Sequence, residues 1–249
     1  MLTAISMPLR RIRRKAYMSE ILSQINWSPL WISLKTGVVA TTIAFFLGLY
    51  IARFVMCRSR KVKWILDGIF TLPLVLPPTV AGFLLLLLFS LRRPVGIFLD
   101  QTLNFRVVQT WAGCVIATTV IAFPLMYRNA RAAFEQVDMN IIHAARTLGL
   151  SERKIFWKVI LPIAAPGVAS GTVLTFARAL GEYGATAMLA GNILGKTRTI
   201  STAIAAETAA GNYTVAGFWT VVIICLSFLI ILAINITTGR GMKQIQRWK

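Results

Sequence analysis

Long apolar runs separated by short basic segments dominate the chain. Residues 83–89 read FLLLLLF, and residues 221–236 contain no charged side chain. A helix needs roughly 20 mostly apolar residues to cross the hydrocarbon core of a bilayer. The pattern predicts an all-α polytopic membrane protein with five spans, at about residues 30–54, 64–91, 110–127, 160–190 and 213–238.

The second predicted span contains Pro73, Pro77 and Pro78. Each proline removes a hydrogen-bond donor and clashes with the preceding helical turn, so one straight helix is excluded. Broken backbone at membrane depth is tolerated only where protein or a water-filled cavity covers it. We therefore expect a kink or a break here, and Pro77 and Pro78 become candidates for shaping a pathway.

Charged residues make up only 14% of the chain, and 27 Lys+Arg against 8 Asp+Glu give a net charge of +19. In a soluble protein this balance would suggest a nucleic-acid partner. Here the bases cluster between the apolar runs, which favours a lipid bilayer and argues against nucleic acid. The three cysteines and the single histidine show no metal-ligand spacing, so we expect no metal site.

The lysines and arginines also predict the orientation. Five spans place three segments on each side of the membrane: residues 53–63, 128–158 and 240–249 on one side, and residues 1–27, 92–109 and 191–212 on the other. The first set carries fifteen bases and the second carries ten. Because the basic side faces the cytoplasm, the N-terminus is expected outside and the C-terminus inside.

The chain divides into three parts on this pattern. Residues 1–26 form a basic N-terminal arm, whose five bases oppose the predicted orientation, and Met18 is an alternative start of translation. Residues 27–240 form the transmembrane domain, and residues 241–249 form a basic cytoplasmic tail.

The predicted cytoplasmic loop 138–162 reads DMNIIHAARTLGLSERKIFWKVILP. Asp138 is a good N-cap for one helix, and Ser151 can cap a second, with Glu152 in its first turn. Gly149 is placed to end the first helix in a left-handed conformation. The loop is therefore expected to be two short helices joined by a glycine turn.

The first of these helices carries an apolar stripe with bases around it. Its stripe recurs at helical spacing, at Ile141, Ile142, Ala145 and Leu148. The nearby bases are Arg146, Arg153 and Lys154. Such a surface suits a helix that docks into a groove of a partner protein. It equally suits an amphipathic helix that lies on lipid headgroups.

The spacing in this loop resembles the coupling motif of the permeases of bacterial ABC importers. That motif has Glu-Ala-Ala, three residues, Gly, nine residues, Ile, one residue and Leu-Pro. Ala144, Ala145, Gly149, Leu161 and Pro162 stand at matching positions. Two positions depart from it, because Val159 replaces the Ile and His143 stands where many members have Glu.

The resemblance implies the partners and the role of the loop. The coupling residues would be His143, Ala144, Ala145, Arg146, Gly149, Leu161 and Pro162. They would dock into a homodimeric cytoplasmic ATPase that uses ATP and Mg, while this chain binds no cofactor and catalyses nothing. A second copy of the chain would complete the pathway in the bacterial inner membrane, and an extracytoplasmic binding protein would deliver an oxyanion.

Two further stretches are similar to the molybdate branch of these permeases, and the likeness covers about residues 26–240. They read LPLVLPPTVAGFLLL at residues 72–86 and FARALGEYGATAMLAGNILGKTRTI at residues 176–200. The sulfate branch shares part of the second stretch. The paired prolines and the GKTRTI run favour molybdate, and sulfate and tungstate remain alternatives.

Two ionisable residues interrupt the fourth span. Arg178 and Glu182 are four residues apart, so on a helix they would share a face. Charged groups inside a span are candidates for function. The alternatives are that they pair with each other as a structural link, or that they lie in water near the outer mouth.

Other classes of protein fit the sequence less well. Residues 191–197 read GNILGKT, with one residue too few between the glycines for a nucleotide-binding P-loop. A secondary transporter would show inverted repeats or several intramembrane charges. A membrane-embedded enzyme would need paired carboxylates, a histidine cluster or a nucleophile with a base.

Overall fold

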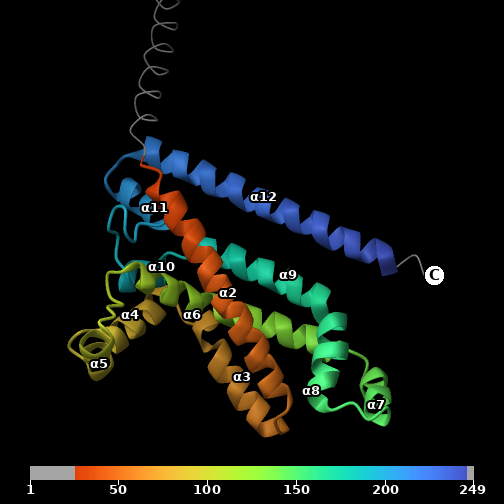
Figure 1. Ribbon diagram of the computed structural model, residues 1–249. Helices are drawn as coiled ribbons and strands as arrows, with labels where there is room; N and C mark the ends of the chain where they lie inside the picture. Colours follow the sequence, from red (N-terminus) through yellow and green to blue (C-terminus); the bar gives the residue numbers. More distant parts are fainter. Residues whose placement is uncertain (1–25, 246–249) are drawn as a thin grey trace, which may run out of the picture.

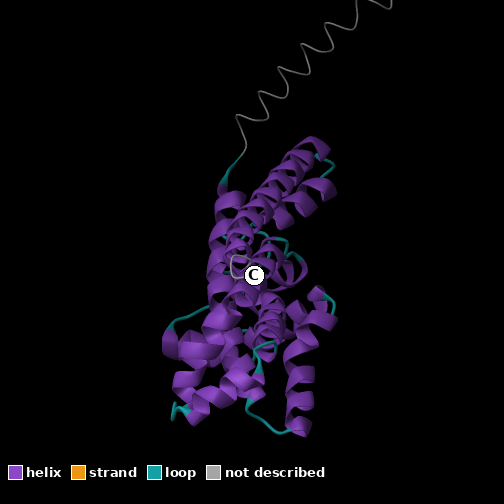
Figure 2. Ribbon diagram, turned by 90° about the vertical axis from the view of Figure 1, so that its right-hand side faces the viewer, coloured by secondary structure: helices purple, strands orange, loops and turns teal. Residues whose placement is uncertain are grey.

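The computed structural model describes the backbone of residues 26–245 and the side chains of residues 26–232. The predicted arm falls almost wholly outside this range, and so do Met18 and the last residues of the tail. Figure 2 shows only helices and loops in the described part. The helices are α2 (Ser28–Met56), α3 (Arg60–Val75), α4 (Pro78–Phe89), α5 (Pro94–Leu103), α6 (Trp111–Glu135), α7 (Met139–Thr147), α8 (Glu152–Ile155), the π-helix η1 (Phe156–Ile160), α9 (Leu161–Leu180), α10 (Gly184–Leu189), α11 (Ile200–Ala209) and α12 (Tyr213–Ile245).

The long apolar helices confirm the predicted spans. Four helical stretches in residues 26–245 are long and apolar enough to cross a membrane, and the bent pair of α3 and α4 brings the number to the predicted five if the pair is counted as one broken span. The chain bends by 106° between the two helices of that pair. Pro77 lies in the break and Pro78 occupies the first helical position of α4, where its missing N–H costs nothing. The predicted break at the paired prolines is therefore confirmed.

Helix α6 is the centre of the bundle, and it packs against both α2 and α9 (Figure 1). Small residues bring these helices close together. Gly48 of α2 lies against Met126 and the backbone of Tyr127, and Gly171 of α9 lies against Asn129. In lipid, association of helices depends on such close packing, because lipid tails are as apolar as the side chains.

Two smaller contacts complete the end of the bundle where α2 begins. Helix α4 packs on α10, where Gly82 lies against the backbone of Ala185. Helix α11 packs on the first turns of α12 through Ile200, Ala203 and Trp219. Much of the remaining apolar surface is exposed, notably along α2, α3, α4 and α12. That surface is suited to contact with lipid or with another membrane-spanning chain.

The fourth span differs from the predicted one at both ends. It was expected to begin near Ile160 and to end near Ala190. A continuous helical run instead begins at Glu152 and ends at Leu180, and α10 is a separate short helix. Pro162 explains the π-helix η1 inside this run. A proline has no N–H to donate to the carbonyl four residues earlier, and its ring clashes with that carbonyl. The wider π turn, which is closed by the hydrogen bond from the Leu161 N–H to the Phe156 carbonyl, accommodates the proline ring.

Two loop regions also contain helices that hydrophobicity did not predict. Residues 92–109 were expected to be a mixed linker and contain α5, which begins at Pro94. Residues 191–212 are polar and Gly-rich, and they contain α11, which begins at a reciprocal capping box between Thr199 and Thr202. Both helices are ten residues long, too short for an apolar run to mark them.

We expect Gly82→Ala to lower the stability of the protein by about 1–3 kcal/mol, because a Cβ at this position would lie 2.6 Å from the Cα of Ala185. Thermal unfolding in detergent measures the change. Gly68→Ala in α3 is the matched control, since no atom lies within 4 Å of its added Cβ. It should leave the melting temperature unchanged or raise it, and equal losses in both variants would contradict the close packing of α4 on α10.

Candidate functional site

The loop between α6 and α9 folds as two helices joined by a turn, as predicted. The Asp138 side chain caps α7 by accepting a hydrogen bond of 2.8 Å from the Asn140 N–H. Gly149 ends α7 with φ +75°. The N–H of Leu150 bonds to the Ala145 carbonyl, and the N–H of Gly149 bonds to the Arg146 carbonyl. These two bonds form a complete Schellman motif, which fixes the direction in which the chain leaves α7.

The second helix starts without the predicted side-chain cap. Ser151 occupies the N-cap position of α8 in an extended conformation, but its hydroxyl makes no capping hydrogen bond. An ion pair secures the turn instead. Arg146 Nε lies 2.7 Å from Glu152 Oε1, and its second nitrogen lies 3.3 Å from Oε2. The Glu152 carboxylate raises the pKa of Arg146. Both side chains are largely exposed, so water screens the pair and its contribution to stability is small.

The predicted apolar stripe of α7 is divided between two faces. Ile142 and Ala145 are 7% and 5% exposed and pack into the main core. Ile141 and Leu148 are 44% and 80% exposed. The inward face therefore holds α7 on the protein, while the outward face leaves Ile141 and Leu148 exposed. Periodicity alone could not separate them, because all four residues fall within one half of the helical wheel.

The base of the loop is tied to the ends of two spans. Phe156 of η1 is buried and meets Phe134 of α6 edge to face, with ring centroids 5.4 Å apart. The guanidinium of Arg53, in the last turn of α2, lies 4.1 Å from the centroid of the Phe156 ring. A displacement of the loop would therefore act directly on α2 and α6.

The seven candidate coupling residues lie in different environments around this loop. His143, Ala144, Arg146 and Gly149 are exposed, and Ala145 is buried. Leu161 is partly buried against the main core, and Pro162 is exposed in the first turn of α9. Only the exposed members can touch a partner directly.

The structure brings the four pathway candidates near one another. Glu182 lies in the turn after α9, where it is 3% exposed and pairs with Arg178 at 2.8 Å. Its other oxygen accepts a hydrogen bond of 2.8 Å from the Ala185 N–H, at the start of α10. Gly184 lies against Pro78, which follows Pro77 at the break of α3 and α4. The predicted pairing of Arg178 with Glu182 is present, although α9 ends before Glu182.

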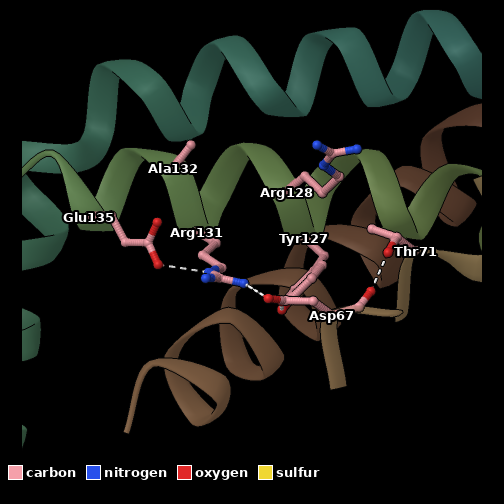
Figure 3. Close-up of a pocket in the computed structure, with 7 residues that line it drawn as sticks. All are labelled: Asp67, Thr71, Tyr127, Arg128, Arg131, Ala132 and Glu135. Atoms are coloured by element: carbon pink, nitrogen blue, oxygen red, sulfur yellow. Dashed lines mark hydrogen bonds and ion pairs between the residues drawn. The ribbon is translucent and has the colours of Figure 1, made fainter. Parts of the chain in front are cut away.

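A polar cluster between α3 and α6 was not among the predicted sites. Asp67 of α3 pairs with Arg131 and accepts a hydrogen bond from the Tyr127 hydroxyl, both on α6. Arg131 also contacts Glu135 at 2.7 Å. These side chains line a pocket of about 420 Å³ (Figure 3). The cluster links α3 to α6 beside the edge-to-face contacts of Phe70 with Phe123 and Tyr127.

The family described as binding-protein-dependent transport system inner membrane component matches residues 44–238. The chain belongs to this family. It is a multi-pass inner-membrane permease of an ABC importer, as the resemblance in the loop implied.

Three relatives of the permease cover most of its length. The putative molybdenum transport system permease protein YvgM of Bacillus subtilis is 39% identical over 217 residues, which are 87% of this chain and 96% of that protein. ModB, the molybdenum transport system permease protein of Escherichia coli, is 40% identical over 184 residues, which are 74% and 80%. The sulfate transport system permease protein CysT of Salmonella typhimurium is 32% identical over 238 residues, which are 90% and 85%.

Two solved structures share the fold of the permease. A chain of the inward-facing MetNI methionine ABC transporter matches with a TM-score of 0.71 at 20% identity, covering 89% of this chain and 98% of that chain. A chain of the bacterial alginate ABC transporter, in complex with its periplasmic protein, matches with a TM-score of 0.74 at 16% identity, covering 97% and 91%. At these identities the likeness shows the fold alone.

One signal in the sequence could have revealed the polar cluster of the permease. Tyr127, Arg131 and Glu135 recur every four residues and share one face of α6. Asp67 joins this face from another helix, α3. Its pairing with α6 depends on how α3 and α6 pack, which the sequence pattern of either helix does not specify.

We expect Asp67→Asn to destabilise the permease by about 1–3 kcal/mol, because the amide loses the charge that Arg131 and Tyr127 contact. Thermal unfolding and hydrogen exchange of residues 60–75 measure the effect. Asp100→Asn is the control, because Asp100 pairs with the exposed Arg106 and its replacement should lower the stability much less than Asp67→Asn does. Similar losses in the two variants would contradict the linking role of the cluster.

Proposed function

We propose that two copies of this permease translocate molybdate, which an extracytoplasmic binding protein delivers. The observation that supports molybdate is the 39–40% identity to permeases named for molybdenum transport, against 32% to a permease named for sulfate transport. Sulfate and tungstate are the alternatives within the same family. The ion itself would be selected chiefly by the binding protein.

The loop between α6 and α9 is the proposed contact with a homodimeric cytoplasmic ATPase, which binds ATP and Mg. Ile141 and Leu148 offer an apolar outward face, and His143 and Ala144 are exposed beside it. Such a face suits a helix-in-groove contact. ATP-driven closure of the ATPase would move α7, and the contacts of Phe156 with Phe134 and Arg53 would carry that movement to α6 and α2.

The other coupling residues support this contact without making it. Ala145 anchors α7, Arg146 braces the turn, and Gly149 sets its direction. Leu161 and Pro162 join the loop to α9 through the π-helix.

The pathway is proposed to run along the two-fold axis of a homodimer. Pro77 and Pro78 break the second span, and α4 packs closely on α10 next to the Arg178–Glu182 pair. These four residues shape the protein around the pathway rather than bind the ion. The N-terminus lies outside and the C-terminus inside, which puts α7 in the cytoplasm, in line with the basic residues of its side.

We expect Leu148→Asp to reduce co-purification of the ATPase at least tenfold, because a carboxylate would replace an apolar side chain that is 80% exposed. Pull-down of the ATPase and measurement of transport-linked ATP hydrolysis test this. Leu103→Asp at the other end of the bundle is the matched control, because Leu103 is also largely exposed. If Leu148→Asp binds the ATPase as well as the wild-type permease does, the proposed docking of α7 on the ATPase is wrong.

The substrate is tested with the binding protein and the reconstituted importer. Molybdate should bind the binding protein more tightly than sulfate in calorimetry, and the molybdate-loaded protein should stimulate ATP hydrolysis by the complex. Tight binding of sulfate alone would assign the permease to sulfate instead. If the binding protein binds none of molybdate, tungstate and sulfate, the proposal that the permease transports an oxyanion is wrong.

A further inference from the structure

The end of the bundle opposite α7 contains a pocket of about 460 Å³ that plays no part in the proposed coupling. It lies between the first turns of α2 and α6 and the loop that follows α10. Trp31 and Lys35 of α2, Trp111 of α6 and Lys196 of the loop contribute to its walls. Aromatic and basic side chains thus meet in one hollow.

The pocket is electropositive. Its charged lining side chains are the two lysines, and no carboxylate lines it. Among residues 26–232, neither lysine lies within ion-pair distance of an acidic side chain. Lys35 Nζ instead lies 4.1 Å from the centroid of the Trp111 ring. The N-terminus of α6 adds the positive end of a 25-residue helix dipole.

The walls of the pocket are held in place by the bundle. Trp111 Nε1–H donates a hydrogen bond of 2.9 Å to Thr36 Oγ1 of α2. Gln109, which has a φ of +59°, donates its N–H to the Leu189 carbonyl at 3.1 Å. These two contacts hold the Trp111 ring against α2 and the backbone of Gln109 against the end of α10.

The depth of the pocket matches the headgroup layer of a bilayer. Helix α2 has 29 residues, so it is about 43 Å long, close to the roughly 40–45 Å of a bilayer with its headgroups. Trp31 then lies about 5 Å and Lys35 about 10 Å along the helix from its start. Tryptophan is enriched at this level, and a lysine near the hydrocarbon border extends its amine toward water.

A largely apolar stripe continues from the pocket along the same face of α2, interrupted by Thr42, whose hydroxyl donates a hydrogen bond to the Val38 carbonyl. Val38, Phe46 and Tyr50 lie on the face that bears Trp31 and Lys35, and all three are exposed. The stripe leads from the headgroup level toward the middle of the span. A ligand with an anionic head and an apolar tail would contact both features at once.

We propose that this pocket binds an anionic phospholipid in the leaflet opposite the coupling loop. The phosphate lies between Lys35 and Lys196, Trp31 and Trp111 flank the glycerol region, and one acyl chain follows the stripe of α2. An acidic segment of a protein partner would pair with the lysines but would leave the stripe unused. A free oxyanion would use neither the stripe nor Trp31.

Native mass spectrometry of the purified full-length permease tests the site with phosphatidylglycerol and phosphatidylcholine of identical chains. Wild-type protein should retain phosphatidylglycerol severalfold more than phosphatidylcholine. Lys35→Gln with Lys196→Gln should lower retention of phosphatidylglycerol at least fivefold. The control is Arg60→Gln with Lys61→Gln, which removes two exposed charges from the start of α3, at the end of the bundle opposite the pocket. This variant should still retain phosphatidylglycerol in preference to phosphatidylcholine.

A second measurement does not depend on charge variants. Phosphatidylglycerol with brominated chains should quench tryptophan fluorescence more than the brominated phosphatidylcholine, and Trp31→Phe should reduce that difference. Equal binding of both lipids by wild type, or unchanged phosphatidylglycerol binding in the lysine variant, overturns the proposal. Displacement of the lipid by 1 mM inorganic phosphate would assign the pocket to a small oxyanion. If the variant with Lys35→Gln and Lys196→Gln no longer captures the binding protein but still binds phosphatidylglycerol, the pocket is a contact site for a protein.

Discussion

Close packing of small residues around α6 is the constraint on which the rest of the structure depends. Glycines of α2 and α9 lie directly against Met126, Tyr127 and Asn129 of this helix. In a bilayer, burial of apolar surface between helices gains little, because lipid already surrounds that surface with hydrocarbon. The helices therefore hold together through contacts that only small side chains permit, and bulky side chains are left for the lipid-facing surface.

This central helix connects the two ends of the molecule. Its first turn carries Trp111 in the electropositive pocket, and its last turns carry Phe134 and the polar cluster of Tyr127, Arg131 and Glu135. The aromatic contact of Phe134 with Phe156 then joins it to the folded loop. A rigid helix with attachments at both ends can transmit a displacement through the membrane without a continuous chain of polar groups.

The sequence predicted those features that depend on composition or on neighbours along the chain. The apolar runs predicted the spans, and the paired prolines predicted the break in the second span. Asp138 and Gly149 predicted where α7 begins and ends. The failures depend on packing. The hydroxyl of Ser151 does not cap α8, the face of α7 divides between Ile142 and Leu148, and Asp67 meets Arg131 of another helix. The pattern within α3 does not encode a contact of Asp67 with Tyr127, which lies 60 residues further along the chain.

The π-helix between Phe156 and Ile160 has a consequence for the angular relation of the loop to the membrane. A π turn holds about one residue more than an α turn, and each residue of an α-helix advances by about 100°. The extra residue therefore rotates everything before it relative to α9, so that Phe156 can face Phe134 while Ala164 and Val168 face the same core. One wide turn therefore determines the rotation of the whole coupling loop about the axis of α9, and the missing N–H of Pro162 accounts for that turn.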